Sequence, residues 1–152
     1  MALIHRVEYL RKEHKGLLEL ARRIEAALAL AGRQAVLDHE QSLAQLRECE
    51  HSLGGVVEHC HADDRIVEST LHEYAGENER AKNEEEHRDL LRKVATFRDE
   101  LRFATVDRLR EASIAGHEFV RTLQTHVAGE SELLDQIVPV RPLRSAAVCP
   151  IR

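Results

Sequence analysis

Residues 3–32 read LIHRVEYLRKEHKGLLELARRIEAALALAG, and this stretch decides the fold class. Its apolar side chains recur in alternating steps of three and four, which places them on one face of an α-helix. Gly32 follows the last of them and predicts the end of the helix. The face contains one polar member, a histidine. Its members are Leu3, Val7, Leu10, His14, Leu17, Ala21, Ile24, Leu28 and Ala31.

The same rhythm predicts three further helices along the chain. A second helix is expected to begin at a capping box of Asp38 and Gln41 and to end at residues 74–76. A third begins near Asn78, and a fourth closes at Pro139. Short connections make neighbouring helices antiparallel, so the expected fold is an all-α, up-down-up-down four-helix bundle.

Two points along the chain stay open in this pattern. The chain is expected to turn at 103–107, although periodicity alone also allows one continuous helix there. Gly54 and Gly55 indicate either a kink or close helix approach, or simply a tolerated pair of glycines. The expected bundle covers residues 1–138, and residues 139–152 are expected to form an extended C-terminal tail.

The composition agrees with an all-α domain and excludes several classes of function. Of the 152 residues, 43% are hydrophobic and 32% charged, whereas only 3% are aromatic, which disfavours a β-sandwich or barrel. A net charge of −5 gives no electrostatic reason to bind nucleic acid. No apolar run is long enough for a membrane span, and no signal peptide is recognisable. Three cysteines fit a reducing compartment, so we expect a cytoplasmic protein.

Polar residues interrupt the inner faces of all four predicted helices. Taken singly, a histidine at such a position is more often a hydrogen-bonded core or boundary residue than a ligand. Together these residues are harder to dismiss, because several buried imidazoles and carboxylates are unfavourable unless they are paired or bind a metal. They are His14, His59, Asp63, His87, His126 and Glu130.

The spacing of these six residues predicts a metal site. Their distances from the predicted turns differ by a helical turn or less, so all six should lie in one layer of the bundle. The i, i+4 pairs His59–Asp63 and His126–Glu130 each place a nitrogen and an oxygen donor on one face. Six such donors exceed the needs of one tetrahedral Zn²⁺. Two ions bridged by carboxylates fit better, with iron favoured and manganese or zinc as alternatives.

The sequence resembles the hemerythrin-like, HHE cation-binding family over residues 5–138. The resemblance lies in Glu13-His14, His59-x-x-x-Asp63-Asp64, Glu86-His87 and His126-x-x-x-Glu130, one on each predicted helix. It implies a non-haem di-iron centre inside the bundle. The four histidines of these motifs would be terminal ligands, and Asp63 and Glu130 would be the bridging carboxylates.

The sequence also departs from that family's pattern. The family's dioxygen carriers have a fifth histidine one turn along the third helix, where this chain has Leu91 and Asn83 on either side of His87. Asp63 replaces a longer glutamate. Such a site resembles members that react with dioxygen, peroxide or nitric oxide, or that sense iron, more than a reversible oxygen carrier. Glu84 is a candidate for the missing ligand.

Other interpretations of the same residues remain open. Glu58-x-x-His61 and Glu84-x-x-His87 have the i, i+3 pairing of ferritin-like di-iron bundles, although the lone histidines on the other helices fit that scheme less well. His61 is a candidate for a supporting role beside a ligand. Cys60 is either a small buried residue or a redox-active thiol.

These observations predict a di-iron protein that binds or reacts with a small oxidant (dioxygen, peroxide or nitric oxide) in sensing, storage or detoxification. Apolar walls that include Leu17, Leu91, Val94 and Phe119 would restrict water. Whether the reaction is enzymatic stays open. The expected partner is the small oxidant, with neither nucleic acid nor membrane, and a homo-oligomer is compatible. The alternative is a helical interaction module that binds no stoichiometric metal.

Overall fold

A computed structural model describes residues 2–139, except for the side chains of 62–72. Over that range the chain is helical and contains no strand. The predicted tail, apart from Pro139, and the Asp63 side chain therefore lie outside the described residues. The elements are α1 (Leu3–Ala31), α2 (Val36–Glu50), α3 (Leu53–Tyr74), α4 (Glu77–Phe103), the 3-10 turn η1 (Val106–Arg108) and α5 (Leu109–Ile137).

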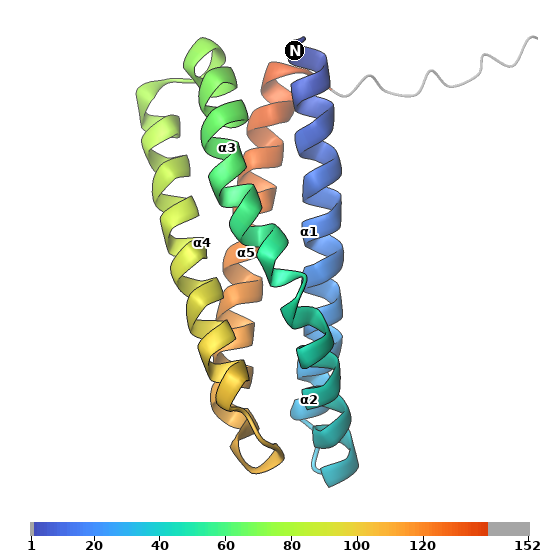
Figure 1. Cartoon of the computed structure of the whole chain (residues 1–152). Helices are drawn as coiled ribbons and strands as arrows, with labels where there is room; N and C mark the ends of the chain where they lie inside the picture. Colours follow the sequence, from blue (N-terminus) through green and yellow to red (C-terminus); the bar gives the residue numbers. More distant parts are fainter. Residues whose placement is uncertain (1, 140–152) are drawn as a thin grey trace, which may run out of the picture.

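The helices form a bundle of four antiparallel rods (Figure 1). Helices α2 and α3 follow one another along the second rod, and α1, α4 and α5 each form a rod alone. Helix α1 packs against α2 and α5, and α4 packs against α3 and α5. The prediction of an all-α bundle is confirmed, as are the turn near 103–107 and the end of the last helix just before Pro139.

The second rod differs from its prediction at both its start and its middle. It begins at Val36 without a side-chain cap, so the predicted capping box is wrong, and Asp38 lies inside the first turn. The rod is interrupted after Glu50, where backbone bonds such as Gly55 N–H to Ser52 O at 3.1 Å span three residues instead of four. The interruption lies just before the glycine pair and agrees with one of the alternatives for that pair, a local kink. A Cβ at Gly55 would meet nothing within 4 Å, so the glycine is not needed for close approach.

The apolar core has two parts of unequal size. The larger part extends along the bundle from Leu17 to the turns at its far end, and includes Phe97 stacked on Phe119 with ring centroids 5.8 Å apart. The smaller part, near the N-terminus, is built on Val7, Leu10 and Leu134. Leu17, Val94 and Phe119, three of the four predicted wall residues, are buried in the larger part, while Leu91 is half-buried against it.

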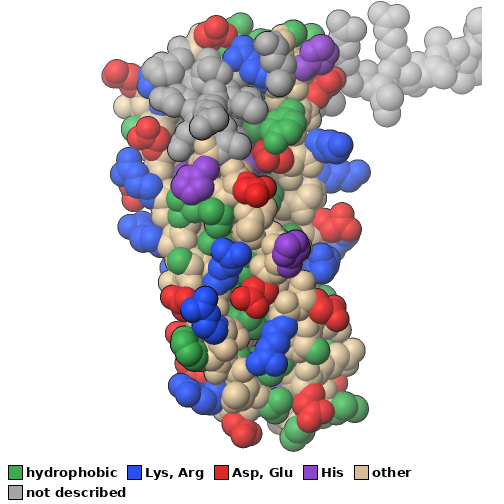
Figure 2. All heavy atoms as spheres, in the orientation of Figure 1, with side chains coloured by type: hydrophobic (Ala, Val, Ile, Leu, Met, Phe, Trp, Pro, Cys, Tyr) green, Lys and Arg blue, Asp and Glu red, His purple; other side chains and the backbone are tan. Residues whose placement is uncertain are grey.

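Charged side chains cover the outside of the bundle. On the face seen in Figure 2, lysines and arginines are interspersed with aspartates and glutamates, so no side chains of one sign dominate it. Among the described residues, none of the helices is both long and apolar enough to cross a membrane.

Candidate metal centre

Five of the six predicted ligands meet in one buried layer between the two parts of the core. The layer draws its side chains from α1, α3, α4 and α5, and each is at most 4% exposed. The sixth predicted ligand, Asp63, follows His59 by one turn of α3, and its side chain lies outside the described residues. The members of this layer, called the centre below, are His14, His59, His87, His126 and Glu130.

Glu130 is placed so that its two carboxylate oxygens face different pairs of histidines. Its Oε1 lies 2.8 Å from His14 Nε2 and 3.9 Å from His59 Nε2. Its Oε2 lies 3.1 Å from His126 Nε2 and 3.4 Å from His87 Nε2. Donor atoms of His59, His87, His126 and Glu130 all lie within 4.8 Å of one another, close enough to bind a common ion.

Polar groups on neighbouring helices contact three of the imidazoles at Nδ1, the ring nitrogen that does not face Glu130. Glu13 Oε2 on α1 lies 3.1 Å from His59 Nδ1 on α3, and Glu86 Oε2 on α4 lies 3.1 Å from His126 Nδ1 on α5. Ser131 Oγ lies 2.9 Å from His14 Nδ1. Sequence reasoning gave these three residues no role, although the Glu-His pairs at 13–14 and 86–87 were visible signals. Such contacts typically orient metal-binding imidazoles.

The hydrogen bonds fix which imidazole nitrogens carry protons. A carboxylate only accepts, so Nδ1 of His59 and of His126 must donate to Glu13 and Glu86. In the neutral imidazoles the two Nε2 atoms therefore direct lone pairs into the centre, 3.4 Å apart. Two lone pairs at that distance repel one another unless a positive charge lies between them. The donor set therefore fits a metal ion.

One carboxylate oxygen of the centre also indicates that the centre fits a metal ion. Glu130 Oε2 is buried and accepts no hydrogen bond from a described residue, although His126 Nε2 and His87 Nε2 lie 3.1 and 3.4 Å from it. A buried carboxylate oxygen without a partner is costly in an apolar interior. A cation bound between Oε2 and the neighbouring Nε2 atoms would remove that cost.

The electrostatics of the centre favour positive charge. Burial alone would lower the pKa of His126, but the carboxylates of Glu130 and Glu86 outweigh burial and raise it above its ordinary value. Burial alone would raise the pKa of Glu130, but the imidazoles of His126, His14 and His87 hold it well below its ordinary value. The metal-free centre thus keeps a carboxylate ionised and attracts a proton where a metal ion would bind.

Several other candidate residues lie away from the centre. Glu84 is exposed and pairs with Arg88 at 3.3 Å, so it is not the missing ligand in this structure. Glu58 and His61 are exposed as well, so neither lies in the buried layer as the ferritin-like i, i+3 arrangement requires. Cys60 is buried beside His59, as the small-residue interpretation predicted.

The remaining histidines do not join the centre. His5, His51 and His117 are exposed and His39 is half-buried, so none of these four side chains belongs to the buried layer. The side chain of His72 is outside the described residues. Burial raises the pKa of the Cys49 thiol, which lies in the larger part of the core.

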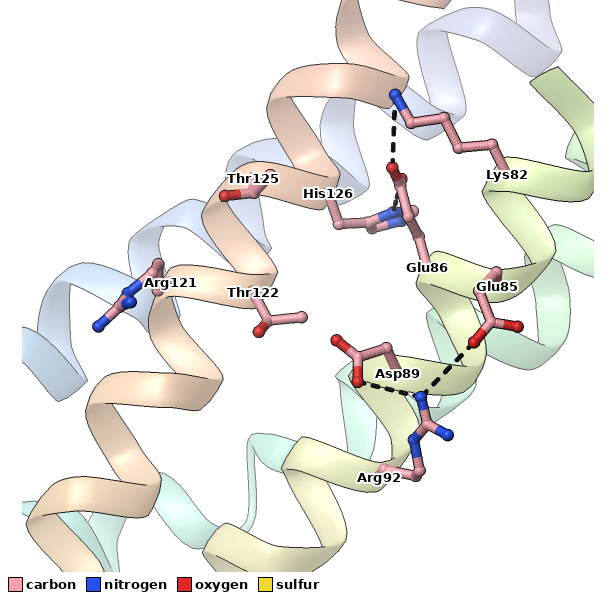
Figure 3. A pocket seen from close by; sticks show the side chains of 9 residues that line it. All are labelled: Lys82, Glu85, Glu86, Asp89, Arg92, Arg121, Thr122, Thr125 and His126. Carbon is pink, nitrogen blue, oxygen red and sulfur yellow. Dashed lines mark hydrogen bonds and ion pairs between the residues drawn. The ribbon is translucent and has the colours of Figure 1, made fainter. Parts of the chain in front are cut away.

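Two grooves between α4 and α5 reach the centre. The first has a volume of about 460 Å³ and reaches His126 (Figure 3). The second has a volume of about 250 Å³ and reaches Glu130. Both are lined by Lys82 and Glu86, whose ion pair at 3.8 Å stands beside His126 in Figure 3. The centre is therefore buried but approachable from the α4–α5 side.

Comparison with known families, curated proteins and solved structures finds no match to this chain. The function has to be argued from the residues of the centre.

Proposed function

We propose that the chain is a di-iron protein of hemerythrin-like type that binds or reacts with a small oxidant. The observation that carries the proposal is the placement of the two carboxylate oxygens of Glu130. One oxygen faces His14 and His59, and the other faces His87 and His126. A carboxylate arranged in this way suits a bridge between two ions, each with two imidazole ligands. Asp63, one turn from His59, remains the proposed second bridge.

The choice of iron rests on the chemistry of the donors. Imidazole nitrogens mixed with carboxylate oxygens suit iron, and manganese and zinc are the alternatives for the same donors. The chemistry that iron supplies when bound is electron transfer to a small oxidant at an open coordination position.

The protein's own residues would prepare the site for that chemistry. Glu13 and Glu86 hold the His59 and His126 rings so that Nε2 faces the centre. Leu17, Val94 and Phe119 exclude water from the adjoining core. The proposed oxidants are dioxygen, peroxide and nitric oxide, in sensing, storage or detoxification.

Metal content tests this function directly. Protein expressed in iron-supplemented medium is analysed by plasma mass spectrometry beside His126→Ala and the matched control His117→Ala, an exposed histidine on the same helix. We expect about two irons per chain in the unsubstituted protein and in the control, as a carboxylate-bridged pair requires. His126→Ala should lose the metal and keep its helical circular dichroism.

Two outcomes would contradict the proposal. A single ion per chain would mean that Glu130 does not bridge. Absence of metal from all three proteins would favour the alternative, a helical interaction module whose buried histidines pair only with carboxylates.

A further inference from the structure

The smaller groove between α4 and α5 is strongly acidic. The described residues that line it include the carboxylates of Glu79, Glu86, Glu130 and Glu132, against one ammonium group, that of Lys82. Lys82 is the one lysine or arginine among the described residues that line the groove, and it pairs with Glu86 at 3.8 Å. A groove of one charge sign concentrates ions of the opposite sign and raises their rate of association.

The inner end of this acidic groove is the buried carboxylate residue of the centre. Glu130 is the one buried residue among the described residues that line the groove. Its Oε2 accepts no hydrogen bond from a described residue, although it lies 3.1 Å from His126 Nε2 and 3.4 Å from His87 Nε2. The groove therefore leads from exposed carboxylates to the residue whose carboxylate lies among the imidazoles of the centre.

The larger groove next to it has a different character. Its lining has as many basic as acidic side chains, and its acids are paired: Arg92 lies 3.2 Å from Asp89 and 3.6 Å from Glu85 (Figure 3). The hydroxyl-bearing Thr122 and Thr125 line its other side. Because its charges cancel, this groove has no comparable attraction for a cation.

We propose that the acidic groove is the route by which a divalent cation reaches the buried centre. The proposal rests on the proposed metal-binding function and adds a loading path to it. Gly129 lines the groove next to Glu130, and a Cβ there would meet nothing within 4 Å. A larger side chain can therefore be introduced at this position to test the path.

The test measures how fast Co²⁺ alone binds to the metal-free full chain, by stopped-flow visible absorption at low ionic strength. The groove variant is Glu79→Gln with Glu132→Gln, one residue on α4 and one on α5. The control variant is Glu84→Gln with Glu118→Gln, which removes the same charge from the same two helices outside the groove. All four residues are exposed, so the fold should tolerate both pairs.

We expect the groove variant to lower the association rate constant by about threefold to tenfold and the control variant to leave it nearly unchanged. The final amount of bound Co²⁺ should be the same in both. Added NaCl should slow the unsubstituted protein more than the groove variant, because the attraction is screened by salt.

A steric pair of variants tests the route without changing charge. Gly129→Leu should slow loading by filling the acidic groove, whereas Thr125→Leu in the larger groove should not. Equal rates in the charge variants, or slowing by Thr125→Leu alone, would overturn the route while stoichiometric Co²⁺ binding still supported the centre. Failure of the unsubstituted chain to bind Co²⁺ would overturn both.

Discussion

Glu13 and Glu86 determine how two of the imidazoles in the centre are oriented. Each belongs to a helix that also contributes a histidine, yet each hydrogen-bonds to the histidine of the next rod of the bundle: from α1 to α3, and from α4 to α5. The two halves of the bundle therefore repeat one arrangement, a Glu-His pair followed by a histidine that the glutamate holds. Both carboxylates are partly exposed, at 24% and 29% of their side-chain surface.

Removing one of these carboxylates should weaken metal binding without removing a ligand. We expect Glu86→Gln to lower the affinity for Co²⁺ by about 10–100-fold, as for other groups that support ligand imidazoles. The neutral amide still accepts from His126 Nδ1–H but no longer makes the imidazole more basic. The measurement is an equilibrium competition with a chromogenic chelator, so it is independent of the loading rate.

Glu85→Gln is the matched control, because Glu85 is the adjacent residue on α4 and pairs with Arg88 and Arg92 on the surface. Its affinity should equal that of the unsubstituted protein. If the two variants bind Co²⁺ equally well, the contact between Glu86 and His126 is structural only.

At the scale of the helices, two glycines contrast in the space around them. Gly55 follows the interruption of the second rod, and a Cβ there would meet nothing within 4 Å. Gly116 lies in α5, where a Cβ would stand 3.0 Å from Phe97 Cε2 and 3.1 Å from Leu28 Cδ2. Both neighbours are fully buried or nearly so, and Phe97 is stacked on Phe119, so neither can move away easily.

The same substitution should therefore have opposite effects at the two positions. Gly55→Ala should raise the free energy of unfolding by about 0.5–1 kcal/mol, through the lower backbone entropy of the unfolded chain. Gly116→Ala should lower it by about 1 kcal/mol or more, because overpacking outweighs the gain in helix propensity. Urea denaturation of the metal-free proteins, followed by circular dichroism, measures both. A gain of stability at Gly116 would mean that the contact between α1, α4 and α5 can relax.

The helices could be predicted from sequence where the apolar periodicity stops at a glycine or proline that ends a helix. Gly32 and Pro139 mark ends that the structure confirms, and the turn at 103–107 was recognisable. The interruption at 51–52 could be indicated only by the nearby glycines. The apolar face continues from Cys49 to Leu53 across the interruption. The apolar periodicity therefore gives no sign that the backbone hydrogen bonds there span three residues instead of four.

The residues of the centre could likewise be predicted only in part. Its histidines and Glu130 were predictable because each is a polar residue at a position where the pattern requires an apolar one. Glu13 and Glu86 lie one residue away from that face, where charged side chains are usual, so their Glu-His pairs are visible in the sequence but do not assign them a role. Which histidine each of them contacts depends on the packing of neighbouring helices, and a single sequence does not contain that information.

At the scale of the whole molecule, the centre interrupts the apolar core and joins all four rods. Its five described members come from α1, α3, α4 and α5, whereas α2 contributes none. Without metal, the centre brings imidazoles within 3.1 to 3.4 Å of one another through their Nε2 atoms. In this layer polar side chains replace apolar contacts, and Glu130 Oε2 accepts no hydrogen bond from a described residue.

Metal binding should therefore stabilise the whole bundle. A ligand that binds only the folded chain adds about 2.7 kcal/mol when its free concentration is 100 times its dissociation constant. We expect thermal unfolding, followed by circular dichroism, to show a higher Tm in excess Co²⁺ than in a chelator. His59→Ala should remain helical and show nearly the same Tm in both conditions, whereas the exposed-site control His51→Ala should keep the difference.

The opposite result is that neither Co²⁺ nor chelator changes the Tm of the unsubstituted chain. That result would mean that the layer is complete without metal. Its histidines would then be held by Glu13, Glu86, Ser131 and Glu130 alone.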